Sequence, residues 1–146
     1  MAKRLKVKLE RKTAMRVNRV SIGKKKLVYV LLAQKQQKYS YHERSRVAYI
    51  GTTKKGIDRI ATSVAVRADA MFGRGVKEFT VRILTCAARP NVKTWEKLER
   101  ALLLVFRQKY GKLPLCNTRG KNMREHDEFD YFKRERLETL LDELAQ

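Results

Sequence analysis

One short segment of the sequence combines several residue types that can bind a phosphate ester. The segment AYIGTTKKGIDRI contains a phenol, a glycine, two lysines and an arginine, at Tyr49, Gly51, Lys54, Lys55 and Arg59. An arginine holds a phosphoryl group through two fixed N–H donors and cannot lose its charge. A glycine at the end of a strand lets the backbone turn with no Cβ in the way, so we expect Gly51 to leave room for a phosphate. The segment therefore indicates a phosphate-binding turn.

The acidic residues limit which phosphoryl chemistry the chain can perform. Hydrolysis of a phosphodiester needs an activated water, neutralised charge on the phosphoryl oxygens and a stabilised leaving oxygen. Only seven acids precede residue 125, and they are scattered, which argues against several carboxylates clamping two metals. Cys86 and Cys116 form no CxxC pair, and with two histidines they make no zinc site. One carboxylate, one metal ion, an arginine and phenols fit this composition better.

Positive charge dominates the composition. The chain has 35 Lys and Arg against 15 Asp and Glu, a formal charge of +20. Residues 125–146 hold eight acids and three bases, a net −5, so the first 124 residues carry 32 bases and seven acids, a net +25. Such an excess on a small domain needs a polyanionic partner, and nucleic acid is the usual one. We find no apolar stretch of spanning length and no basic amphipathic helix with exposed aromatics, so we expect no membrane partner.

The pattern of apolar residues predicts a small α+β domain. Residues 27–33 form a continuous apolar run, typical of a strand buried on both faces, and residues 47–50 make a second strand. Residues 34–46 are polar and basic and are expected to form a long charged loop. Periodicity predicts the later elements: a helix from Ile57 to about Gly73, a strand over 78–86, a helix from Thr94 to about Tyr110, and an acidic helix near the C-terminus. We therefore expect a mainly antiparallel three-stranded sheet flanked by helices.

These residues and their order resemble the GIY-YIG nucleases. The resemblance rests on LVY at 27–29, YIG at 49–51, Arg59, LERALL at 98–103 and Asn117, placed on elements of the matching type. It covers residues 27–117 and implies a GIY-YIG-like catalytic domain over residues 27–122. Residues 1–26 then form a basic N-terminal arm or an edge strand, and residues 123–146 an acidic helix packed on the same domain.

The resemblance implies a metal-dependent DNA endonuclease that hydrolyses phosphodiester bonds. Its catalytic residues would be Tyr29, Tyr49, Arg59, Glu99 and Asn117. Glu99 would hold one Mg²⁺ (or Mn²⁺) against the phosphate and the leaving oxygen. One tyrosine would take a proton from the attacking water while the other orients it, and a nearby cation can lower a phenol pKa for this role. Which tyrosine is the base is left open. Asn117 would fix the Glu99 helix to the tyrosine strands.

Three features depart from the family pattern. Leu27 replaces the glycine of the first tyrosine motif, and residues 34–46 make a longer connection than usual. Ser63 stands where many members carry a histidine or tyrosine, so His42 is a possible substitute in proton transfer.

Two of the candidate residues have simpler explanations that the sequence leaves open. Glu96 rivals Glu99 as the metal ligand, although its spacing from Arg100 favours a surface ion pair. Tyr29 lies in an apolar run and is equally explained as a core residue.

A set of basic and aromatic residues is expected to contact the nucleic acid, because aromatics among bases stack on nucleotides. The set is Gly51, Lys54, Lys55, Tyr39, Tyr41, His42, Arg44, Arg119 and Lys121. We expect the partner to be DNA, with RNA as an alternative, and the protein to be a cytoplasmic monomer or homodimer, nucleoid-associated in a prokaryote or phage. Two other functions fit the same charge: a non-enzymatic nucleic-acid-binding protein, ribosome-associated or architectural, and a catalytically dead nuclease fold.

Overall fold

The computed structural model describes residues 4–18 and 20–146, and it has the α+β architecture expected from the sequence. The strands are β1 (Leu27–Lys38), β2 (Arg44–Thr53) and β3 (Phe79–Leu84). The α-helices are α1 (Ile57–Gly73), α2 (Thr94–Tyr110), α3 (Glu128–Tyr131) and α4 (Arg134–Ala145), with a 3₁₀ turn, η1 (Ser40–His42), between the first two strands. No helix among these residues is both long and apolar enough to cross a bilayer.

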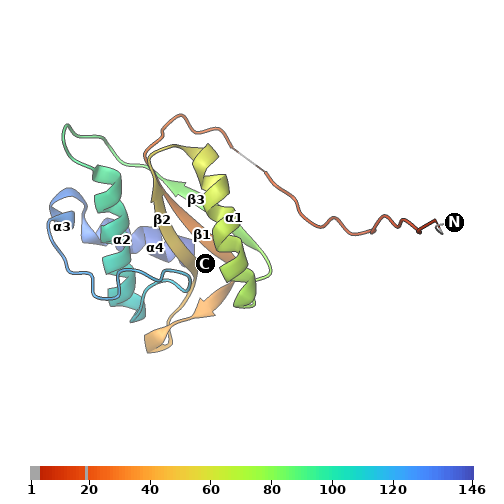
Figure 1. Cartoon of the computed structure of the whole chain (residues 1–146). Coiled ribbons are helices and arrows are strands. Elements are labelled where there is room, and N and C mark those ends of the chain that lie inside the picture. The colour runs from red at the N-terminus through yellow and green to blue at the C-terminus, as the bar shows by residue number, and fades with distance from the viewer. Residues whose placement is uncertain (1–3, 19) are drawn as a thin grey trace.

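The sheet is antiparallel with β1 in the centre, in the order β2-β1-β3. Helix α1 covers one face and α2 and α4 cover the other (Figure 1). Alternate residues of β1 serve the two cores: Val28 and Val30 pack toward α2, while Tyr29 and Leu31 pack toward α1. The continuous apolar run at the start of β1 is therefore buried on both faces, as predicted.

The long charged loop predicted over residues 34–46 is wrong, because the two strands continue through most of it. Strand β1 extends to Lys38 and pairs there with Arg44, which leaves a short turn. Tyr39 anchors this turn: its buried hydroxyl donates to the Val47 carbonyl at 2.6 Å and accepts from the Leu115 N–H at 3.0 Å. Tyr41 has a positive φ of 62°, as tight hairpin turns require.

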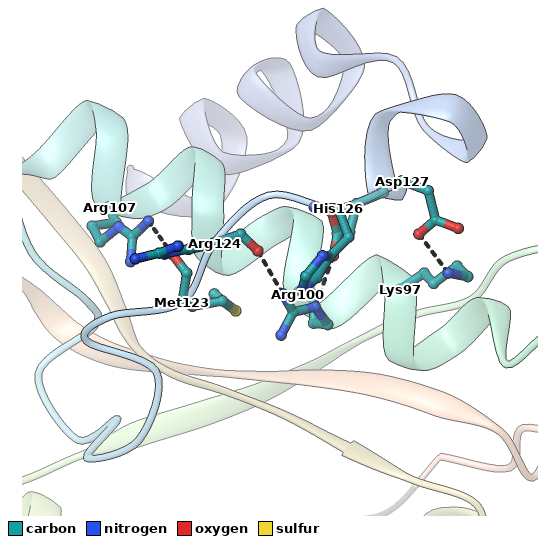
Figure 2. A network of polar contacts seen from close by, with 8 residues as sticks. Lys97, Arg100, Arg107, Met123, Arg124, His126 and Asp127 are labelled. Carbon is teal, nitrogen blue, oxygen red and sulfur yellow. Dashed lines mark hydrogen bonds and ion pairs between the residues drawn. The ribbon is translucent and has the colours of Figure 1, made fainter.

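The C-terminal segment, expected to be one acidic helix, is divided into α3 and α4. Basic residues of α2 hold the chain before α3 in a non-helical path (Figure 2). Arg100 pairs with buried Glu128 at 2.7 Å and also donates to the Arg124 carbonyl at 2.7 Å. Arg107 donates to the Met123 carbonyl at 2.6 Å. The ion pair between Glu96 and Arg100 suggested by spacing is replaced by this contact with Glu128, which lies 28 residues away.

The N-terminal segment is an arm and not an edge strand in the part that the structure describes. Residues 4–18 are exposed along their whole length and project away from the body (Figure 1). The chain returns to the body at Ile22, which packs against the core on the α1 side. The main chain is then fixed by a hydrogen bond from the Gly56 N–H to the Lys25 carbonyl, at 2.8 Å.

Candidate functional site

Two phenols close over Gly51 at one end of the sheet. Tyr29 lies directly across from Gly51 in the β1–β2 pairing, and the rings of Tyr29 and Tyr49 are 5.9 Å apart between centroids. A Cβ on Gly51 would lie 2.7 Å from Cζ of Tyr29, 2.7 Å from Cε1 of Tyr49 and 2.8 Å from the Tyr29 hydroxyl. The expectation that Gly51 leaves room for a phosphate is therefore corrected, because the phenols occupy that space. Glycine is needed here so that the two rings can meet.

Helix α1 supplies two polar side chains to these phenols. Ser63 lies close enough to the Tyr29 hydroxyl to lower its pKa, and the Arg67 guanidinium lies 4.6 Å from the centroid of the Tyr49 ring. Sequence reasoning missed Arg67, although a signal exists. Arg59, Ser63 and Arg67 recur every four residues and so share one row of the helix. Arg59 is exposed and lies one turn before Ser63 on this row.

Tyr29 keeps its proton at neutral pH. Burial raises the pKa of Tyr29 to about 12, and the neighbouring Tyr49 phenol adds to the shift. The Ser63 hydrogen bond and the Arg67 charge oppose it only in part. A protonated phenol donates a hydrogen bond to an anion and is a poor general base, so the structure favours Tyr29 as a donor.

Glu99 reaches the next residue of β2 from the other side of the sheet. Burial raises the pKa of the Glu99 carboxyl above its usual value, and hydrogen bonding to the nearby Thr52 side chain opposes this shift only in part. Successive residues of a strand point to opposite faces, so Gly51 faces the phenols while Thr52 faces α2. Because β2 is an edge strand, the two faces meet at its free edge. The carboxylate and the phenols thus lie on either side of one dipeptide.

Asn117 seals the edge of β2 immediately before this dipeptide. Its side-chain amide accepts from the Ile50 N–H at 3.0 Å and donates to the Ile50 carbonyl at 2.9 Å. The preceding Cys116 N–H donates to the Ala48 carbonyl at 2.8 Å. The segment after α2 therefore runs along the edge of β2 and fixes the position of the strand that carries Tyr49.

We expect Asn117→Ala to lower the free energy of unfolding by about 2–4 kcal/mol, because each backbone group of Ile50 left without a partner costs about 1–3 kcal/mol when it stays out of water. Urea denaturation followed by circular dichroism measures the loss. Asn122→Ala, at an exposed loop position, is the matched control and should change stability by less than about 0.5 kcal/mol. Equal stability of the two variants would show that the edge of β2 needs no such partner.

The donors at this edge suit a magnesium ion that also binds substrate. Among residues 4–18 and 20–146, no three His, Cys, Asp or Glu side chains cluster where they could hold a metal. Glu99 offers a single hard carboxylate beside the Thr52 hydroxyl. Mg²⁺ commonly binds one or two carboxylates and completes its shell with water and substrate phosphates, whereas zinc needs three or four protein ligands. The donor chemistry therefore fits Mg²⁺ and does not fit a structural or catalytic zinc.

Comparison of the chain with protein-family models, curated proteins and solved structures found no match. The geometry of the site and the physical chemistry of its residues therefore carry the functional argument.

The residues expected to contact nucleic acid do not all lie on one surface. Tyr39 is removed from the set, since its ring is 3% exposed and both of its hydrogen bonds are internal. Tyr41 is 72% exposed at the hairpin tip. The remaining side chains of the set are exposed: Lys54, Lys55, His42, Arg44, Arg119 and Lys121. The tip is nine residues along β1 from Tyr29, about 30 Å at the rise of a strand, so it cannot contact the phosphate that Glu99 would bind.

Proposed function

We propose that this protein is a metal-dependent DNA endonuclease that hydrolyses phosphodiester bonds at a GIY-YIG-type site. One observation carries the proposal: a protonated phenol and a partly buried carboxylate reach adjacent residues, Gly51 and Thr52, at the free edge of one strand. Burying a carboxylate costs free energy, and clustered ionisable groups with raised pKa values are typical of functional sites.

Each residue has a role that follows from its surroundings. Tyr29 donates a hydrogen bond to a phosphoryl oxygen, since its proton is held at neutral pH. Tyr49, which carries the Arg67 charge over its ring, orients the attacking water. Exposed Arg59 neutralises charge on the phosphoryl group. Glu99 holds Mg²⁺ or Mn²⁺, and such an ion supplies Lewis-acid stabilisation of the leaving oxygen when it is bound.

A second function, nucleic-acid binding without catalysis, is favoured by a different observation. The net charge of +20 and the exposed basic arm bind DNA whether or not the site is active. The two functions predict the same affinity for DNA and the same loss of affinity with salt. Only cleavage separates them.

The decisive experiment is a digest of end-labelled single-stranded, duplex and branched DNA, with Mg²⁺, with Mn²⁺ and with a chelator. A nuclease cuts at least one substrate, and only when a divalent ion is present. Binding of all three without cleavage under any condition would leave the binding protein as the function. A labelled RNA duplex in the same digest separates DNA from RNA as the substrate.

We expect Arg59→Ala to slow cleavage by about 10²- to 10⁴-fold, because removing one preorganised charge from a developing anion typically costs several kcal/mol. Single-turnover rates at saturating enzyme measure the effect. Arg82→Ala is the control: it removes the same charge from an exposed position on β3, the opposite edge of the sheet. A fall of less than threefold for Arg59→Ala would remove this residue from the site.

A further inference from the structure

Residues 22–26, called the strap below, contact the start of α1 and the first turn of α2. Ile22 packs into the core beneath α1, and the Gly56 N–H holds the Lys25 carbonyl at the start of that helix. Lys26 lies over the Trp95 ring in the first turn of α2, with 4.6 Å between Nζ and the ring centroid. The strap is therefore fixed to the body at three points, unlike the arm that precedes it.

The strap lies beside the candidate site. Gly56, which binds the strap, also accepts the Arg59 N–H at 3.2 Å. Trp95 is four residues before Glu99, so Lys26 lies about one helical turn from the carboxylate along α2. The lysines of the strap, Lys24, Lys25 and Lys26, are all exposed at this place. A polyanion bound at the site would meet them directly.

Beyond the strap, residues 4–18 make a long cationic track. They carry six bases and a single acid, Glu10, which pairs with Lys8 at 3.4 Å. In extended chain the first bases, Arg4, Lys6 and Lys8, fall on one side, and Leu5, Val7 and Leu9 fall on the other. Fifteen extended residues span about 50 Å, roughly one and a half turns of B-DNA. Residues 4–26 contain no aromatic side chain to anchor the arm at a membrane surface.

We propose that the strap and the arm form one binding element that follows the phosphate backbone of a duplex for about a turn beyond the scissile phosphate. This inference rests on the proposed function of the site, because the strap borders it. It assigns the substrate class as long duplex nucleic acid, and short fragments bind only at the site and the strap. The basic side chains of the arm contact the phosphates, and Leu5, Val7 and Leu9 do not contact the duplex.

The test compares two full-length variants in DNA binding with a chelator present, so that no cleavage occurs. In the charge variant, Arg4, Lys6, Lys8, Arg11, Lys12 and Arg16 are changed to Gln. In the control, Leu5, Val7 and Leu9 are changed to Ser, which keeps every charge. Affinities for 10-bp and 40-bp duplexes are measured by fluorescence anisotropy at 50 and 200 mM salt.

The charge variant should bind the 40-bp duplex with a salt slope shallower by about 5, because each phosphate contact contributes about 0.9 to the slope. The ratio of its dissociation constant to that of wild type should therefore fall by about 10³-fold between 50 and 200 mM salt. Both variants should bind the 10-bp duplex like wild type. Equal salt slopes for wild type and the charge variant would overturn the proposal, as would an equal loss on both duplexes or an equal effect of the apolar control.

This outcome is separable from the proposed function because the binding assay involves no catalysis. A length-dependent arm on a protein that never cuts DNA would refute the nuclease alone. Cleavage by a protein whose arm has no effect on binding would refute the arm alone.

Discussion

Glu99→Gln is expected to lower the rate of Mg²⁺-dependent DNA cleavage by about 10³-fold or more while leaving DNA affinity nearly unchanged. Glutamine keeps the size of the side chain and can still hydrogen-bond to Thr52, but it lacks the charge that attracts a divalent ion. Mg²⁺ would depend mainly on this one carboxylate, because no three His, Cys, Asp or Glu side chains cluster together among the described residues. Single-turnover cleavage and anisotropy measured on the same preparation separate catalysis from binding.

Glu96→Gln is the matched control, one turn earlier on the same helix and at an exposed position. It removes the same charge, so a general electrostatic effect would lower both rates equally. We expect cleavage by Glu96→Gln within threefold of wild type. A reversed order, with Glu96→Gln inactive and Glu99→Gln active, would move the metal to Glu96.

The free energy of unfolding of Glu99→Gln tests the role of this carboxylate independently of cleavage. Burial raises the folded pKa of Glu99 above its ordinary value of 4.5, so the folded state holds this proton more tightly than the unfolded state. The free energy of unfolding therefore falls as pH rises from 4.5 through the folded pKa, and the loss persists at neutral pH. Glutamine removes this pH dependence. Without divalent ions at pH 7, calorimetry should find the variant at least as stable as wild type, whereas a purely structural Glu99 would make it less stable.

Gly51→Ala is expected to damage both the fold and the site. The new Cβ would lie under 3 Å from both tyrosine rings, and Tyr29 is a buried ring in the central strand that has little room to move. Overpacking of this kind typically costs about 1–3 kcal/mol. The rings must also separate, so we expect cleavage to fall by at least about 10²-fold even where the protein remains folded.

Gly73→Ala is the control for this substitution. A Cβ on Gly73 would meet nothing within 4 Å outside its own helix and chain neighbours, and this glycine has no positive φ. The variant should match wild type in cleavage and should be equally stable or slightly more stable, because alanine restricts the unfolded chain. Thermal unfolding and single-turnover rates are measured for both variants. Wild-type activity in a folded Gly51→Ala protein would show that the contact between the phenols is not needed.

The strands and helices that could be predicted from the sequence are those whose apolar residues follow a regular local spacing. The apolar run of β1 and the three- and four-residue periodicity of α1 and α2 follow from which side chains must be buried. The extension of β1 into a polar segment does not, because it depends on Tyr39 reaching Val47 and Leu115, which is 76 residues away. The break before α3 likewise depends on Arg100, 28 residues before its partner Glu128.

The candidate residues of the site came from the sequence, and their arrangement comes from the structure. Tyr29, Tyr49 and Glu99 came from resemblance, and the structure places them around Gly51 and Thr52. The sequence did not reveal that Gly51 makes room for the two phenols, because a glycine before a turn can equally make room for a phosphate. Arg67 had a signal in the four-residue spacing of its helix row, but the ring it covers is on another element.

The contacts of Cys116 and Asn117 with β2 have a consequence for behaviour at high concentration. Exposed sheet edges offer backbone groups that another molecule can pair with, which is a common route to aggregation. At Ala48 and Ile50 those groups are already satisfied from within the chain. Strand-to-strand association of two molecules through this stretch of β2 is therefore blocked, in a protein whose net charge of +20 also makes whole molecules repel one another.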